Sequence, residues 1–196
     1  MYIKTHKDDL PSGLNLGNEI AVDTEAMGLE PKRDPLTLVQ ISTGKEDCHI
    51  VRLDRKNYKA NNLVKILQDS SINKIFHFAR FDVAVLKHFL KADVKNIYCP
   101  KVASKIARTY TDKHGLKDLV KEIIGVEMSK QMQSSDWGAE KLSEKQLKYA
   151  ALDVIYLHKI KSELNKMLIR ENRLTLLENC LKFITTRVEL DLADYK

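Results

Sequence analysis

The first half of the chain alternates short runs of branched and aromatic residues with polar turns, whereas the second half repeats its hydrophobic residues at helical spacing. Short runs of this kind are typical of strands, because side chains two apart on a strand lie on one face. The turn TGKED joins two of the runs into an antiparallel hairpin. The five predicted strands are residues 20–23, 36–42, 48–53, 74–78 and 96–99.

Helices are predicted where apolar residues recur every three or four positions. Gly125 ends one of them, as a residue that tolerates left-handed backbone. The residues from Ser143 to Gln146 form a capping-box pattern, which begins the longest helix. The predicted helices are residues 62–69, 79–90, 101–110, 114–125, 143–168 and 171–184, before a short amphipathic tail. This pattern predicts a three-layer α/β fold with extra C-terminal helices.

Composition narrows the class of protein. The 196 residues, of which 43% are hydrophobic, suit one domain spanning residues 1–196. A formal net charge of +6 and a pI near 9.1 favour a polyanionic partner, although solvated lysines give the same balance. The three cysteines show no CxxC spacing, which argues against a zinc ribbon and fits a reducing cytoplasm. No apolar leader and no apolar run of about 18–20 residues occurs, so we expect no membrane partner.

Acidic residues interrupt apolar segments at three places. Asp23 and Glu25 stand two apart at the end of the first predicted strand, so their carboxylates either hold a cation or are solvated acids at a strand end. Asp82 follows the fourth predicted strand near a helix start, where the helix dipole alone would favour it. Tyr149 precedes Asp153 by four residues, which places phenol and carboxylate on one helix face. That pair is either part of a site or a hydrogen-bonded pair at the edge of the core.

Taken in order, the segments VDTEAMGL, HFARFD and YAALDV resemble the motifs of the DEDDy 3′–5′ exonucleases of the ribonuclease D type. The related DEDDh group carries histidine where this chain has Lys148, so the tyrosine branch is indicated. Nearly the entire chain is similar to the compact nano-RNase C form of the family, including the segment HGLKDLVKEIIGVEMSKQMQSSDWG. The resemblance implies a ribonuclease-H-like exonuclease fold, with a mixed five-stranded sheet flanked by helices.

The resemblance also implies a chemistry. It implies phosphodiester hydrolysis with two divalent cations, Mg²⁺ or Mn²⁺, which prefer carboxylate oxygens. Asp23, Glu25 and Asp153 would hold the ion that activates the attacking water. Asp23 would bridge to the second ion, which Asp82 would help to hold, and Tyr149 would orient the water. The implied substrates are short RNA, dinucleotides included, and DNA, and the products are nucleoside 5′-monophosphates.

Assembly and the competing functions follow from the same resemblance. It implies a homo-oligomeric ring, for which we expect an octamer, and residues 171–196 are the expected contact segment. The alternatives are ribonuclease-D-like trimming of longer RNA ends, a DNA exonuclease, and an inactive nucleic-acid-binding module. The presence of all four acids and of Tyr149 argues against the inactive module.

Several residues near the motifs are candidates for substrate contact. Leu29 is either a wedge between the last two bases, as the resemblance implies, or a leucine that caps the core. Phe81 either stacks on a base or packs in the core, and His77 either contacts a phosphate or is a buried strand histidine. The other candidates for contact with the substrate are Met27, Lys130, Gln133, Ser134 and Ser135.

Three further features have weaker assignments. Trp137 is predicted to pack the longest helix against the sheet. Phe78 stands where many ribonuclease D relatives have asparagine, so a polar contact from that position to the scissile nucleotide is not expected. A basic group either follows a nucleic-acid backbone or is scattered surface charge, and it consists of Arg52, Arg55, Lys56 and Lys59.

Overall fold

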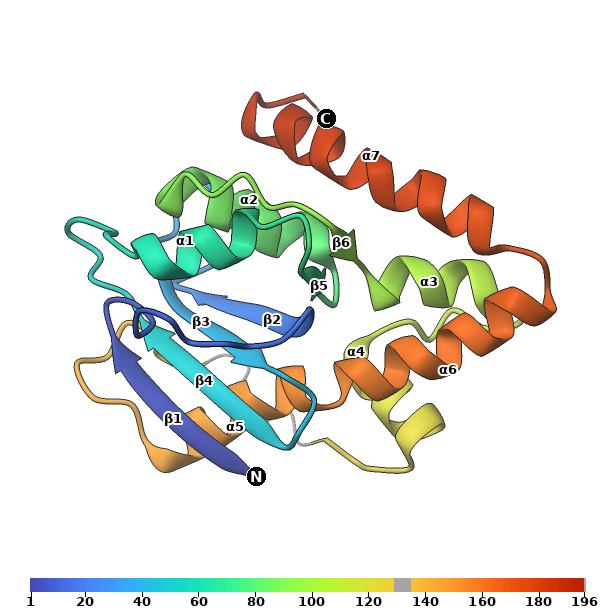
Figure 1. The fold of residues 1–196 in the computed structure, drawn as a ribbon, viewed down its shortest axis with the longest axis horizontal. Helices are drawn as coiled ribbons and strands as arrows, with labels where there is room; N and C mark the ends of the chain where they lie inside the picture. Colours follow the sequence, from blue (N-terminus) through green and yellow to red (C-terminus); the bar gives the residue numbers. More distant parts are fainter. Residues whose placement is uncertain (129–134, 196) are drawn as a thin grey trace.

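A mixed six-stranded sheet forms the centre of the fold, with helices on both of its faces (Figure 1). The structure is a computed structural model, which describes residues 1–128 and 135–195. The strand order is β1-β4-β3-β2-β5-β6. The strands are β1 Tyr2–Lys7, β2 Glu19–Ala26, β3 Leu36–Ser42, β4 Asp47–Arg52, β5 Asn73–Ile75 and β6 Ile97–Tyr98. β2, β3 and β4 pair antiparallel, whereas the β1–β4, β2–β5 and β5–β6 pairs are parallel.

The sheet has one strand more than the five that the sequence predicts. The additional strand is β1, which pairs with β4 and places Ile3 opposite Cys48. Most of its residues are exposed lysine, threonine and tyrosine, so no apolar alternation marks it in the sequence. The extent of two predicted strands also changes. β2 continues to Ala26, so its acids lie inside the strand, and β5 already ends at Ile75.

The predicted helices form, but four of them differ in extent, including the one predicted over residues 101–110, which already ends at Ala107. The helical segments are α1 Asn61–Gln68, α2 Ala79–Leu90, α3 Pro100–Ala107, α4 Leu116–Leu119, the π-helical η1 Val120–Ile124, α5 Glu144–Ile155, α6 Leu157–Arg170 and α7 Leu174–Leu192. The longest predicted helix divides at Tyr156 into α5 and α6. The helix predicted to end at Gly125 consists of α4 and η1, and α7 includes most of the predicted tail. Among the helices of the described residues, none has the length and hydrophobicity needed to cross a bilayer.

The start of α5 is fixed by the predicted capping box. The Gln146 backbone N–H donates to Ser143 Oγ at 3.2 Å, and the Ser143 backbone N–H donates to Gln146 Oε1 at 2.9 Å. These two bonds satisfy amide groups that the first turn of a helix otherwise leaves without partners. An α-helix turns by a constant angle per residue, so fixing its first residue also fixes the direction in which each later side chain of α5 leaves the helix.

The alternating residues of β2 divide between two hydrophobic clusters, one on each face of the sheet. Ile20 and Val22 belong to the cluster that includes residues of α1 and α2, whereas Ala21 belongs to the cluster that includes residues of α5 and α6. Period-two alternation therefore turns Asp23 toward α5 and Thr24 toward α2. Because β2 lies between β3 and β5, this central strand can present polar residues to helices on both faces.

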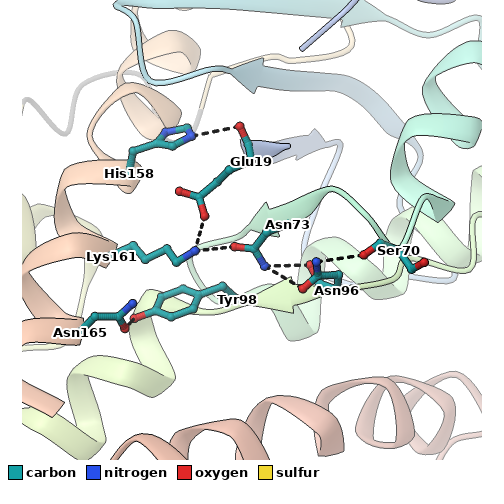
Figure 2. A network of polar contacts seen from close by, with 8 residues as sticks. All are labelled: Glu19, Ser70, Asn73, Asn96, Tyr98, His158, Lys161 and Asn165. Carbon is teal, nitrogen blue, oxygen red and sulfur yellow. Dashed lines mark hydrogen bonds and ion pairs between the residues drawn. The ribbon is translucent and has the colours of Figure 1, made fainter. Parts of the chain in front are cut away.

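A network of polar contacts ties α6 to the beginning of β2 and to β5 (Figure 2). Lys161 Nζ forms an ion pair with Glu19 and donates to Asn73 Oδ1 at 2.7 Å. Tyr98 Oη donates to Asn165 Oδ1 at 2.8 Å. These bonds lie at the opposite end of β2 from its acids, and they help to set the position of α6 and thereby of the preceding α5.

Candidate active site

Three carboxylates from two elements meet on the α5 side of β2. One oxygen each from Asp23, Glu25 and Asp153 lies within 4.8 Å of the other two. The strand brings the first two acids to one face, and α5 places the third against them. They line a cleft of about 450 Å³, together with Tyr149 and Lys117. The structure therefore brings together three of the four predicted metal ligands.

The close approach of these acids is costly for their charged forms. Burial, followed by the charges of nearby carboxylates, raises the pKa of Asp23 and of Glu25 well above the ordinary values. Burial also raises the pKa of Asp153 to about 7, while the nearby Lys117 lowers it. A cation between the carboxylates would remove this cost. Oxygen-only donors of this kind suit Mg²⁺ or Mn²⁺, so the residues fit the predicted cofactors.

The fourth acid, Asp82, lies apart from that group of three. It is only 3% exposed in the first turn of α2, and its Oδ1 accepts a hydrogen bond from Thr24 Oγ1 at 2.7 Å. Its charge nevertheless contributes to the raised pKa of Asp23 and of Glu25, so it belongs to the same electrostatic neighbourhood. Its place in the first turn of α2 agrees with the interpretation as a helix N-terminal acid, and the carboxyl is also buried and hydrogen-bonded to Thr24.

Tyr149 lies one turn before Asp153 on α5, as its spacing predicts. Burial, and then the charges of Asp153, Glu25 and Asp23, raises the pKa of its phenol. The neutral phenol can therefore donate a hydrogen bond, but it is a poor base unless a cation is near. Its ring lies 6.2 Å from that of Trp137, which is itself buried in the cluster around α5 and α6. The predicted packing role of Trp137 is confirmed.

We expect Tyr149→Phe to reduce kcat by about 100-fold or more with little change in KM, because a positioned proton donor or acceptor contributes roughly 10²–10⁴-fold. Removing only the hydroxyl leaves the ring packing intact. The measurement is steady-state kinetics of the variant on short RNA, the substrate that the sequence resemblance implies. Tyr156→Phe, at the junction of α5 and α6, is the matched control. An unchanged kcat in Tyr149→Phe would remove the phenol from the mechanism.

Two lysines at the cleft were not predicted from the sequence. Lys117 lies on α4, with its Nζ 5.9 Å from the Tyr149 ring, and Lys101 lies on α3. The charge of Lys101, after burial, lowers the pKa of His77 to about 3, so this histidine is neutral. The chain has 33 lysines and arginines, and nothing in the local pattern singles out these two. Only the packing of α3 and α4 beside β2 and α5 brings them to the acids.

The predicted substrate residues differ in where they lie. Leu29 is 83% exposed, so the interpretation as a leucine that caps the core is wrong. Met27 is half-exposed, and its sulfur lies 2.9 Å from Arg55 Nη1. Phe81 is partly buried and packs against the α2 side of the core, which confirms the packing interpretation. His77 follows β5 and lines the acidic cleft instead of lying within the strand.

The segment before α5 contains the remaining candidates. The Ser135 Oγ accepts a weak hydrogen bond from Gln146 Nε2 at 3.4 Å, which keeps Ser135 next to the start of α5. Arg52 donates to the carbonyl of Ala139 at 2.6 Å, and Arg55 donates to that of Gly138 at 3.2 Å. The candidates outside the described residues are Lys130, Gln133 and Ser134.

The basic group is therefore divided. Arg52 and Arg55 donate hydrogen bonds to the segment that leads into α5, which goes beyond the interpretation as scattered surface charge, although Arg55 itself is exposed. Lys56 and Lys59 are exposed, as that interpretation expects. The arginines thus influence the site through the start of the helix that carries Tyr149 and Asp153.

Comparison with known proteins places this geometry in a family. A sequence family described as "3′-5′ exonuclease" matches residues 3–169. Ribonuclease D of Gluconacetobacter diazotrophicus is 30% identical over 155 residues, which are 79% of this chain and 39% of that protein. Ribonuclease D of Xanthomonas oryzae is 30% identical over 190 residues, which are 95% of this chain and 51% of that protein. The chain thus spans between about two fifths and one half of these curated relatives.

Solved structures agree with the sequence comparisons. NrnC of Brucella melitensis has a TM-score of 0.95 and 50% identity, and the match covers 99% of this chain and 95% of that one. Other structures of that protein carry bound Mg²⁺ or bound pGG. Ribonuclease D of Escherichia coli has a TM-score of 0.75 and 26% identity, with 87% of this chain and 46% of that one covered. This chain belongs to the 3′–5′ exonuclease family, with ribonuclease D and NrnC among its relatives.

Proposed function

We propose that this protein is a metal-dependent 3′–5′ exonuclease that hydrolyses short RNA, including dinucleotides, to nucleoside 5′-monophosphates. The observation that carries the proposal is the group formed by Asp23, Glu25 and Asp153 in an open cleft. The similarity to NrnC over nearly the whole length of both chains supports short RNA as the substrate, because one structure of that protein holds pGG.

The acids have separate tasks in this proposal. Asp23, Glu25 and Asp153 would hold one divalent cation, and Asp23 and Asp82 would hold a second. When bound, such a pair of Mg²⁺ or Mn²⁺ ions supplies the nucleophilic water and stabilises the charge of the leaving oxygen. The Tyr149 phenol donates a hydrogen bond that orients the water. Lys117 adds positive charge on the side of the cleft where charge develops on the phosphate.

A substrate panel tests the proposal. The panel contains end-labelled dinucleotide RNA, a longer single-stranded RNA, the equivalent DNA and a duplex. We expect rapid conversion of the dinucleotide to monophosphates, and any cleavage of DNA should likewise start at its 3′ end. Stepwise trimming of the long RNA while the dinucleotide persists would instead support ribonuclease-D-like end trimming, and a preference for DNA would support the DNA exonuclease.

We expect Leu29→Ala to raise the KM for a dinucleotide by about 10-fold or more. The reason is that burying a leucine side chain contributes about 1.5–3 kcal/mol, which the exposed Leu29 gains only when a substrate covers it. The measurement is KM together with the Mn²⁺ concentration that gives half-maximal activity, which should not change. Ile169→Ala, at an exposed isoleucine on α6 outside the proposed contact segment, is the control. Equal kinetics for Leu29→Ala and the parent protein would rule out the wedge.

Assembly and location complete the proposal. The protein forms a homo-oligomeric ring, and residues 171–196 supply contacts between copies. The exposed side chains of Leu176 and Phe183 on α7 support this role, because such groups lower the free energy when a second copy covers them. Light scattering should give eight times the monomer mass of 22.5 kDa, and a monomeric mass would overturn the ring. The free cysteines Cys48, Cys99 and Cys180 support a cytoplasmic location.

A further inference from the structure

Phe78 has a backbone conformation that is unfavourable for its side chain. It precedes α2 with φ of 72° and ψ of 45°, in the left-handed region. Bulky residues rarely adopt this region, because Cβ crowds the neighbouring carbonyl oxygen. The side chain is also 45% exposed, so burial of the ring does not explain why this residue is there. Strain of this kind concentrates at ligand-binding positions.

Phe78 lines three hollows, one of which, of about 230 Å³, it shares with Lys101 and with Phe183 of α7. It lines the acidic cleft, and it also lines a cavity of about 550 Å³ together with Leu29 and Phe81. That volume falls within the roughly 300–1,000 Å³ of small-molecule sites. The exposed Leu29 and the half-exposed Phe78 thus give this cavity apolar walls directly beside the acids.

A lysine lies over the face of the same ring. Lys101 Nζ lies 3.9 Å from the centroid of the Phe78 ring, within the range of a cation–π interaction. Lys101 lines the acidic cleft with Phe78, whereas Leu29 lines the cavity with Phe78. Phe78 therefore connects the cleft that holds the ammonium group with the cavity that holds Leu29, and its half-exposed side chain is available to a flat, apolar surface.

We propose that Phe78 is a stacking platform for a nucleobase, which enters the cavity between Phe78 and Leu29. Lys101 holds the ring in place from the cleft side, next to the backbone phosphate of the same substrate. This inference rests on the proposed function and adds how a base is held. Stacking on an aromatic face accepts every base, so the platform adds affinity without sequence preference.

Two substitutions at Phe78 separate stacking from strain. Phe78→Asn removes the ring and places in the left-handed conformation a residue that tolerates it. We therefore expect unchanged or increased thermal stability, with a KM for dinucleotide RNA raised by about 5- to 150-fold, the range of base–aromatic stacking. Phe78→Tyr keeps the ring and should stay within about 3-fold of the parent KM. Tyr2→Asn, at an exposed aromatic on the opposite edge of the sheet, is the control.

Dinucleotides that lack one base identify the contact. One substrate carries an abasic ribose at its 3′ nucleotide and the other carries it at its 5′ nucleotide. For the substrate without the stacked base, the parent protein and Phe78→Asn should have the same KM. For the other substrate, Phe78→Asn should still have a higher KM than the parent protein. The platform would be overturned if Phe78→Asn and the parent protein had equal KM values for the intact dinucleotide. It would also be overturned if the substitution raised KM by the same factor for all three substrates. If the parent protein leaves every dinucleotide intact, the proposed function has failed instead.

Discussion

Asp153→Asn should abolish hydrolysis of short RNA, with kcat reduced by at least about 10³-fold, while the protein stays folded. Stabilisation of transition-state charge by a bound cation contributes several kcal/mol, and about 4 kcal/mol corresponds to that factor. The amide keeps the shape of the carboxyl but supplies one neutral oxygen in place of a charged group. Because Asp153 is one of only three acids in the group, its loss leaves two ligands on β2.

The same substitution should not destabilise the protein. Burial and the charge of Asp82 raise the pKa of the Asp153 carboxyl to about 7, so the ionised group costs free energy in the metal-free protein. We therefore expect the melting temperature of Asp153→Asn to equal or exceed that of the parent in EDTA. Asp118→Asn is the matched control, because Asp118 lines the same cleft outside the group of three. Near-normal turnover by Asp153→Asn would refute its role as a ligand.

Removal of divalent cations should have an equally large effect. EDTA should reduce hydrolysis to background, and either Mg²⁺ or Mn²⁺ should restore it, because both prefer oxygen donors. The carboxylates repel one another without a cation, so Mn²⁺ should also raise the melting temperature of the parent protein by binding the folded state. That rise should be smaller in Asp153→Asn than in Asp118→Asn, which separates binding at this group from binding elsewhere.

Two outcomes would contradict the metal assignment. Activity that persists after chelation and removal of EDTA would show that hydrolysis needs no exchangeable cation. Restoration by Zn²⁺ alone would conflict with a group made only of carboxylate oxygens, since zinc sites usually include nitrogen or sulfur ligands.

The parts of the site that depend on regular spacing were predictable from the sequence. Two acids two apart on a strand share a face, and Tyr149 and Asp153 four apart share a turn of helix. The structure has both arrangements. The capping box at Ser143 was predictable for the same reason, because its hydrogen bonds are local.

The parts that depend on long-range packing were not predictable. The Thr24–Asp82 hydrogen bond joins residues 58 positions apart, and it forms only because Thr24 and α2 lie on the same face of the sheet. The break at Tyr156 interrupts an apolar pattern that continues into α6, so periodicity gives no warning of it. β1 was missed because it is held at the edge of the sheet by backbone pairing with β4, and its mostly exposed side chains leave few apolar positions.

Anomalous scattering from crystals soaked in Mn²⁺ tests the central claim most directly. We predict two peaks about 3.5–4 Å apart, one among the carboxylates of Asp23, Glu25 and Asp153 and the other between Asp23 and Asp82. Crystals of active protein with no peak at this group, or with manganese bound only elsewhere, would contradict the account.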